Sequence, residues 1–325
     1  MSVVEPRERA HAQPVRRALH LPIGDVGPVA ARAVAAGGDG CVRAVFARSA
    51  YVEVDRAFIC VGVPELGCGA LNALVTSGST LRAWLAQVAP GERVTATPRQ
   101  LRIGGMRIDF ARARCWHPPQ PALPVDHARL AQGVVQMRRA AIERMPDEGL
   151  AFLVAEASPN PRARVSTAPA DSLAAMSGTS RNPLAPVGHA AASVLQQWLA
   201  RGARADPAIA ARPLADLIGL GPGLTPSGDD FLGGALVALH AFGRTAAANS
   251  LAAWLLPLGD RGTHPISAAH LRAAAAGFGG EALHACLCAL AAARDAGASL
   301  TAISAVGHTS GWDALAGALT VAAAI

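Results

Sequence analysis

Two segments of the chain place serine and aspartate at the same spacing, directly ahead of an apolar run. Residues 227–236 read SGDDFLGGAL and residues 310–319 read SGWDALAGAL, so seven of ten positions are identical. The shared Ser-Gly-x-Asp pattern is typical of a capping box, with Ser227 or Ser310 as the N-cap and the aspartate as the third helical residue. The repeat therefore predicts two similar helix starts, and we expect both N-termini to converge on one cavity.

A glycine-rich loop precedes the first copy. Residues 219–226 read GLGPGLTP, and a chain that only had to begin a helix would not need so many turn-forming residues. Loops of this kind present converging N–H donors beside the positive end of the helix dipole, which favours anion binding. The loop and the two helix starts supply the expected ligand-binding residues, which are Gly221, Gly223, Thr225, Gly228, Asp230, Ser310 and Asp313.

Asp229 and Asp230 complicate an anion site, because two carboxylates beside one helix N-terminus would repel a bare phosphate. Either a divalent cation such as Mg²⁺ bridges the carboxylates and the ligand, or the carboxylates accept N–H bonds from an amide. The second solution suits a ureido or carbamoyl group beside a carboxylate. In a capping box the third helical position bonds back to the N-cap, and the second lies about 100° away around the helix. We therefore expect Asp229 to bind the ligand or a metal, and Asp230 to serve mainly the cap.

His308 stands directly before the second copy and is the best-placed candidate for a general acid or base. With Asp229 and the hydroxyl of Ser227 it makes up the expected catalytic set. Candidates at other helix starts are His264, His270 and Glu281. Capping boxes and single histidines also occur for structural reasons alone. An alternative is therefore that these residues only stabilise helix starts and bind no ligand.

Residues 21–116 are predicted to form a small β-rich domain. Short β-type runs separated by turn residues occupy 41–47, 51–55, 57–63, 92–97, 101–103 and 106–110. The last two runs meet at Gly104-Gly105, which is a hairpin signal. Between 40 and 116 only residues 70–89 show the helical apolar period. A small sheet or barrel is expected.

The remainder of the chain is predicted to be helical. Residues 117–124 contain four prolines and should form a stiff connector. Ala/Leu-rich segments with helical spacing follow at 125–145, 187–202, 207–218, 228–243, 246–256, 266–276, 280–296 and 312–325. The predicted fold class is α+β, with a small β-rich N-terminal domain and a larger, mainly α-helical domain at 125–325. Residues 1–20, with four arginines, are expected to be a flexible basic tail.

Composition excludes several classes of protein. All 29 basic residues are arginine, so mechanisms that need a lysine amine, such as those of Schiff-base aldolases, P-loop nucleotidases and protein kinases, are excluded. The excess charge of +6 lies within residues 1–116, but few aromatic side chains accompany it, so no nucleic-acid partner is expected. No apolar run reaches the roughly 18 residues that span a bilayer. Six cysteines without a C-x-x-C pair indicate buried free thiols, and the protein is expected to be cytoplasmic without a membrane partner.

Three motifs resemble a known bacterial family. They lie at residues 219–234, 266–277 (ISxxxLxxAxxG) and 307–317 (GHTSGWDxLxG). The family, formerly a domain of unknown function, includes the third subunit of oxamate carbamoyltransferase from anaerobic allantoin degradation. The resemblance extends over roughly 40–325 and implies a subunit that works with other proteins to move a carbamoyl group between oxalurate and phosphate.

The expected chemistry is compatible with this resemblance. Carbamoyl transfer develops charge on a tetrahedral carbon and on phosphate oxygens, and it requires well-placed hydrogen-bond donors more than a covalent nucleophile. Arginine would have to bind phosphate in place of lysine, with Arg181 and Arg261 as candidates. Three alternatives remain: a non-catalytic partner subunit that binds an anion or ligand, a carboxylase-type enzyme, and a nucleic-acid binder through the Arg-rich first half.

Overall fold

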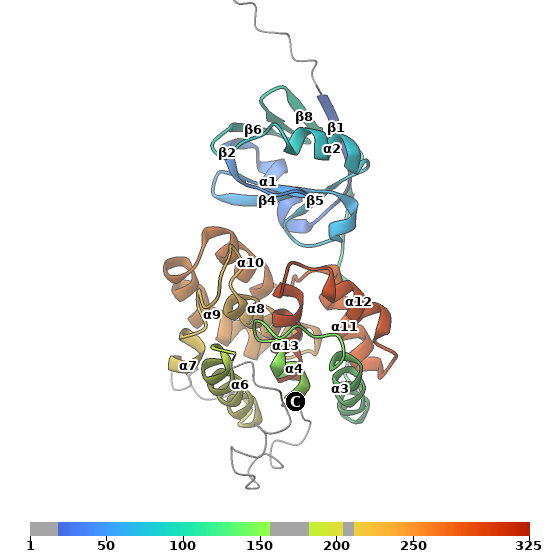
Figure 1. Cartoon of the computed structure of the whole chain (residues 1–325), viewed down its shortest axis with the longest axis vertical. Helices are drawn as coiled ribbons and strands as arrows, with labels where there is room; N and C mark the ends of the chain where they lie inside the picture. Colours follow the sequence, from blue (N-terminus) through green and yellow to red (C-terminus); the bar gives the residue numbers. More distant parts are fainter. Residues whose placement is uncertain (1–18, 157–181, 204–210) are drawn as a thin grey trace, which may run out of the picture.

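The computed structural model describes residues 19–156, 182–203 and 211–325. These residues form a β-rich N-terminal part and a mainly helical C-terminal part, stacked end to end (Figure 1). The predicted α+β fold class is therefore confirmed. The expected basic tail differs at its end, because strand β1 already begins at Leu19, and residues 1–18 lie outside the described residues.

The N-terminal part is a small barrel. Its strands are β1 (Leu19–Val26), β2 (Gly38–Val45), β3 (Ser49–Val54), β4 (Ala57–Gly62), β5 (Asn72–Val75), β6 (Arg93–Thr97), β7 (Gln100–Ile103), β8 (Met106–Asp109) and β9 (Arg114–Cys115). Their order in the sheet is β5-β4-β3-β2-β6-β7-β8-β1-β9, and the sheet closes because β1 also pairs with β5. Closure removes the exposed sheet edges that an open sheet would leave.

Alternating burial explains why these segments form strands. In β7, Leu101 and Ile103 are buried inside the barrel while Arg102 between them is exposed, which is the period of two expected of a half-buried strand. The hairpin predicted at Gly104-Gly105 is confirmed, because Ile103 of β7 pairs directly with Met106 of β8.

The helix predicted at 70–89 is correct only in its second half. Helix α2 spans Gly78–Leu85, whereas residues 72–75 form strand β5, which lies between β4 and β1. A short apolar run that is buried on both faces has no period of its own, so the sequence pattern does not distinguish a strand from a helix there. Four further elements were not predicted, namely strands β1 and β9, helix α1 (Pro28–Ala36) and the short 3₁₀ helix η1 (Pro64–Leu66).

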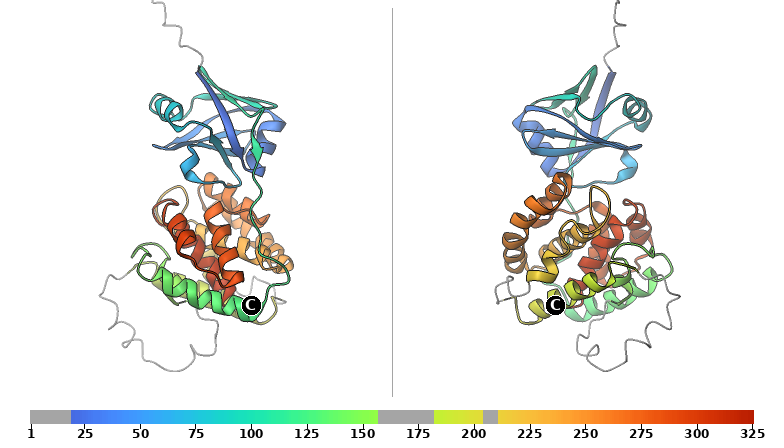
Figure 2. Two further views of the ribbon diagram at one scale, coloured as in Figure 1. Left: turned by 90° about the vertical axis from the view of Figure 1, so that its right-hand side faces the viewer. Right: turned by 60° about the vertical axis from the view of Figure 1, so that its left-hand side comes forward.

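The C-terminal part is a bundle of helices around one large apolar core (Figure 2). The helices are α3 (His127–Ala141), α4 (Phe152–Glu156), α6 (Ala185–Ala200), α7 (Ala211–Ala215), α8 (Ser227–Ala241), α9 (Thr245–Gly262), α10 (Pro265–Ala275), α11 (Glu281–Ala292), α12 (Gly297–Ser304) and α13 (Ser310–Ala322). Of these, α4 and α12 were not predicted. No helix in the described ranges could cross a membrane. All six cysteines are free thiols, but the expectation that they are buried holds only for Cys60 and Cys286, since Cys41, Cys68 and Cys288 are partly exposed and Cys115 is exposed.

Helices α8 and α13, which carry the two motif copies, cross at equivalent glycines. A side chain at Gly234 would overlap the backbone carbonyl of Ala314, and a side chain at Gly317 would overlap that of Phe231. Both glycines are the eighth residue of their copy, and both carbonyls belong to the fifth. The two copies are therefore related by an approximate twofold axis in the bundle, and glycine is required at each because the backbones touch.

The two predicted capping boxes are not present. Helix α8 has Pro226 as its N-cap and helix α13 has Thr309, and neither side chain caps its helix by accepting a backbone N–H. Each serine is therefore the first helical residue rather than the cap. The Asp230 carboxyl is hydrogen-bonded to Ser310 of the other copy, and the Asp313 carboxyl is hydrogen-bonded to the Leu150 N–H and to the hydroxyls of Thr309 and Ser227.

Candidate functional site

A cavity of about 910 Å³ lies between the barrel and the helical part. The barrel contributes residues from β3, β4 and the segment around η1, and the helical part contributes residues from the N-termini of α8 and α13 and from α10, α11 and α12. Its chemically active lining residues include Arg48, Tyr51, Glu65, Asn72, Thr225, Asp229, Asp230, Ser267, His270, Glu281 and Ser310. The cavity confirms that the two repeated helix starts converge on one hollow, as the sequence predicted.

Direct contacts between the two parts bound this cavity. Glu281, the first residue of α11, accepts a hydrogen bond from the Cys68 N–H at 2.9 Å through its carboxylate, and its own N–H donates to the Cys68 carbonyl at 2.8 Å. Gly69 and Gly280 form an isolated β-bridge beside this pair. Glu281 lies in the first turn of α11, and its hydrogen bonds with Cys68 fix the barrel to the bundle.

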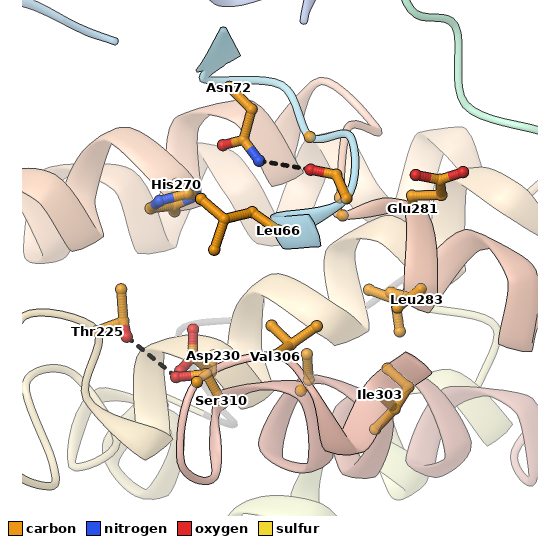
Figure 3. A pocket seen from close by; sticks show the side chains of 18 of the residues that line it. Leu66, Asn72, Thr225, Asp230, His270, Glu281, Leu283, Ile303, Val306 and Ser310 are labelled. Atoms are coloured by element: carbon orange, nitrogen blue, oxygen red, sulfur yellow. Dashed lines mark hydrogen bonds between the residues drawn. The ribbon is translucent and has the colours of Figure 1, made fainter. Parts of the chain in front are cut away.

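Thr225 and Ser310 join the two motif copies at the cavity wall. Their hydroxyl oxygens are 3.0 Å apart, which links the loop before α8 to the first residue of α13 (Figure 3). Hydroxyl pairs of this kind can donate and accept, so they can reorganise toward a ligand that offers both amide hydrogens and carbonyl oxygens.

Asp230 lies beside this pair with one carboxyl oxygen, Oδ2, that is enclosed and has no hydrogen-bond partner. Burial raises the pKa of Asp230 well above its usual value, and the nearby Asp313 and Asp229 raise it further, while hydrogen bonding to Ser310 opposes the shift. The shift favours the protonated carboxyl, which can donate a hydrogen bond or a proton. A protonated Asp230 therefore places a potential hydrogen-bond donor at the cavity wall.

Asp229 has a different role from the predicted one. It is only 2% exposed, and its carboxylate accepts hydrogen bonds from the Gly219 N–H at 3.0 Å, the Ser267 hydroxyl at 2.7 Å and the Thr263 hydroxyl. These bonds fasten the glycine-rich loop to the start of α10. The expected division is therefore reversed, because Asp229 holds the loop in place while Asp230 keeps an unbonded oxygen.

A metal site at Asp229 is not supported. Both of its oxygens already accept hydrogen bonds from protein donors, and no group of three or more histidine, cysteine, aspartate or glutamate side chains in the described ranges is arranged to hold a metal ion. The bridging Mg²⁺ considered from the sequence thus has no ligand set around this residue.

Other expected site residues lie away from the cavity. Those that do not line it are Gly221, Gly223, Ser227, Gly228, His308 and Asp313. The glycine-rich loop uses some of its donors internally, since the Gly228 N–H bonds to the Leu220 carbonyl at 2.9 Å. Gly221 has φ +116°, a conformation that side chains rarely adopt, so its glycine is explained by the backbone path.

His308 was predicted to point into the cavity as a general acid or base, and this is wrong. Its Nε2 lies 2.7 Å from a Glu148 carboxylate oxygen, and 81% of its side chain is exposed. The turn before α13 directs the ring outward. His264 is also structural, because its Nδ1 accepts the Ile266 N–H at 3.2 Å as the N-cap of α10.

Ser227 and Asp313 form a buried pair that corresponds to the pair of Ser310 and Asp230 at the cavity. Burial raises the pKa of Asp313, and hydrogen bonding to the Leu150 N–H, at 2.5 Å, and to the hydroxyls of Thr309 and Ser227 opposes the rise. The serine of each copy therefore acts on the aspartate of the other, as expected for a pair related by a twofold axis. Only the Ser310–Asp230 pair lies at the cavity.

Tyr51 and His270 form a contact between the two parts that the sequence reading did not identify. The Tyr51 hydroxyl is 3.0 Å from His270 Nε2, and both residues line the cavity. Burial lowers the pKa of His270 to about 4, so the ring is neutral at pH 7. Burial also raises the pKa of Tyr51, with Cys60 and Asp230 adding to the rise. The only sequence signal was that His270 lies in a predicted helix next to a candidate loop.

The cavity carries more acidic than basic groups. Arg48, which is exposed, is the only arginine among the described lining residues, whereas Glu65, Glu281 and two aspartates contribute carboxyl groups. Arg261 is exposed in the last turn of α9 and does not line the cavity, and Arg181 lies outside the described residues. Arg261 is therefore not placed at the site, and the prediction for Arg181 stays a prediction.

The part of the chain that carries both motif copies matches a known family model. No curated protein and no solved structure matches this chain. The barrel lies outside the matched residues, whereas Thr225, Asp230, His270 and Ser310 lie within them. The resemblance inferred from the motifs is confirmed, because residues 217–322 match the family model of the oxamate carbamoyltransferase subunit AllH.

Proposed function

We propose that this chain is a ligand-binding subunit of an oxamate carbamoyltransferase-type enzyme, and that its cavity binds the ureido acid oxalurate. The observation that carries the proposal is the polar end of the cavity, where Thr225, Asp230 and Ser310 meet within the family-matched region. Hydroxyl groups and a protonated carboxyl offer donors and acceptors to a ureido group without a large charge.

The reaction itself needs a proton at one nitrogen. In phosphorolysis of oxalurate, a phosphate oxygen bonds to the ureido carbonyl carbon, and the bond from that carbon to the oxalyl-bearing nitrogen breaks. The nitrogen takes up a proton and leaves as the amide of oxamate, while the other product is carbamoyl phosphate. Phosphate loses one proton when its new bond forms, so the protons balance.

Asp230 is proposed to supply that proton. Its raised pKa favours the protonated form, so it can donate to the departing nitrogen and then accept the proton that phosphate releases. The Thr225 and Ser310 hydroxyls would stabilise the oxygen of the tetrahedral intermediate. Asp229 keeps the loop that bears Thr225 in position.

The acidic lining favours one alternative within the same family. With Arg48 as its only arginine among the described lining residues, the cavity offers little charge to a phosphate dianion. A subunit that holds only the ureido acid, while a partner subunit supplies the phosphate-binding cations, fits this electrostatic balance. Such a subunit would bind oxalurate alone but would not catalyse phosphorolysis alone.

Two measurements on the purified chain test the proposal. Calorimetric titration with oxalurate should show saturable binding, and Asp230→Asn should weaken it by about tenfold or less while abolishing any carbamoyl phosphate formation. His308→Asn, on the exposed surface, is the matched control and should leave both unchanged. Absence of oxalurate binding would contradict the proposal. Binding without turnover would select the alternative in which a partner completes the site.

A further inference from the structure

The cavity has two chemically different ends. Thr225, Asp230 and Ser310 lie on one side, Leu283 and Ile303 lie on the other side below Glu281, and Val306 lies between the two groups (Figure 3). The polar end is formed by the N-termini of α8 and α13, while the apolar end is formed by α11, α12 and the segment between α12 and α13. Each end comes from its own set of elements, so the division is built into the fold.

The apolar end contains both fixed and accessible side chains. Leu283 and Ile303 are 5% and 1% exposed and are anchored in the core of the bundle, whereas Val306 is 38% exposed. Ala298 and Ala302, one turn apart on α12, also line the cavity and are exposed. Their small side chains leave room in front of the apolar wall.

The size of the cavity exceeds what oxalurate needs. At about 910 Å³ it lies near the upper limit of the roughly 300–1,000 Å³ typical of sites for drug-sized ligands. Oxalurate is a small ion without an apolar group, so it fills only the polar end and leaves Val306, Ala298 and Ala302 in contact with water. Apolar side chains around an open cavity favour a ligand that covers them.

We propose that the cavity binds a ureido acid with an apolar substituent of about the size of a leucine side chain. The ureido group lies at the Thr225–Ser310 end, and the apolar group lies against α11 and α12. This inference rests on the proposed function, because it assumes that the polar end binds ureido acids, and it extends the substrate class beyond oxalurate.

Three ligands and one variant that fills the apolar end of the cavity test the inference. Calorimetry should show N-carbamoyl-leucine binding at least tenfold more tightly than N-carbamoylglycine, because each buried methylene strengthens binding about fourfold. Ala302→Phe, which fills the apolar end, should weaken N-carbamoyl-leucine binding at least tenfold and change N-carbamoylglycine and oxalurate binding by less than twofold. Ala253→Phe, at an exposed alanine of α9 outside the cavity, is the matched control and should change neither.

The outcomes separate the two proposals. Equal affinity for the two N-carbamoyl amino acids, with oxalurate still bound, would overturn the apolar subsite and leave the proposed function intact. Failure of oxalurate and both N-carbamoyl amino acids to bind would overturn both. Equal weakening of all three ligands by Ala302→Phe would contradict separate ends. If Ala302→Phe does not fold by thermal melting, Ala298→Phe on the same face replaces it.

Discussion

The two motif copies share most of their residues but do different work. At the third position the first copy has Asp229, which fastens the glycine-rich loop, and the second has Trp312, which is 2% exposed in the core. At the fourth position Asp230 keeps an unbonded oxygen at the cavity, while Asp313 accepts the Leu150 N–H and is fully buried. Shared residues thus build the helix crossing, and the surroundings of each copy decide which one faces a ligand.

Substitutions that disrupt the crossing of α8 and α13 should have the largest effect on the free energy of unfolding. Gly234→Ala and Gly317→Ala should each lower the free energy of unfolding by about 3 kcal/mol or more, because each new side chain overlaps a backbone carbonyl. Gly233→Ala is the adjacent control, since a side chain there meets Ala274 at an ordinary 3.7 Å, and it should be neutral or stabilising by up to about 1 kcal/mol. Urea unfolding measures all three. Equal losses at 233 and 234 would show that the helices do not cross as described.

Substitutions of the two adjacent aspartates should have different effects, one on stability and the other on ligand binding or turnover. Asp229→Ala removes the acceptor of three donors and should cost roughly 3 kcal/mol of unfolding free energy. Asp230→Asn should leave the melting temperature nearly unchanged and reduce turnover or oxalurate binding. Thermal melts and titrations on both variants provide the comparison. If Asp230→Asn instead destabilises the protein as much as Asp229→Ala, Asp230 is a structural residue.

The pH dependence of stability should identify the buried acids. Burial raises the pKa of Asp230 and Asp313, so the folded state holds protons that the unfolded state releases above about pH 4, and stability falls as pH rises toward the folded pKa. Burial lowers the pKa of His270 and His284 to about 4, so these rings make stability rise between about pH 4 and 6.5 and contribute no slope above that.

Above about pH 4, therefore, Asp230→Asn should remove part of the decline of stability with rising pH that the raised pKa of Asp230 causes. Urea unfolding of the unaltered chain and the variant at several pH values from about 4 to 9 measures the difference between their slopes, to which the histidines common to both do not contribute. Asp313→Asn supplies the second copy's counterpart. Identical slopes in all three proteins would mean that neither carboxyl retains its proton in the folded state.

The smallest effect is expected at the first position of each copy. Ser310→Ala removes a hydroxyl that contacts Thr225 at the cavity and should weaken oxalurate binding several-fold with little change in stability. Ser227→Ala, which acts on buried Asp313, should cost about 1 kcal/mol of stability and leave binding unchanged. Calorimetry and thermal melts would detect this contrast, and the reverse pattern would exchange the roles of the two copies.

Sequence reading predicted the two-part fold, most strands and helices, and the meeting of the two copies. It succeeded there because apolar periods and turn residues are local signals, as at the Gly104-Gly105 hairpin. The predictions were wrong about where several side chains of the candidate site point. The roles of Asp229 and Asp230 depend on α10 and α13, and the outward turn of His308 depends on Glu148, which is 160 positions away along the chain.

Tyr51 illustrates a different limit. Its contact with His270 joins residues 219 positions apart on opposite sides of the cavity, and no pattern within either segment indicates the other. The strand at 72–75 was missed for a related reason, because its apolar residues are explained only by the two strands that enclose it. The periodicity of apolar residues within a segment carries no information about which distant segment that segment contacts.

The reciprocal glycine crossing also has a mechanical consequence for the site. Each helix obstructs sliding of the other at Gly234 and Gly317, so the N-termini of α8 and α13 form a stiff base beneath the ligand. The opposite wall, which includes Leu66 and Tyr51, belongs to the barrel and is joined to that base through the Cys68–Glu281 and Tyr51–His270 hydrogen bonds. The helix crossing therefore fixes the distance between the two helix starts, whereas the position of the opposite wall depends on the hydrogen bonds that join the barrel to the bundle.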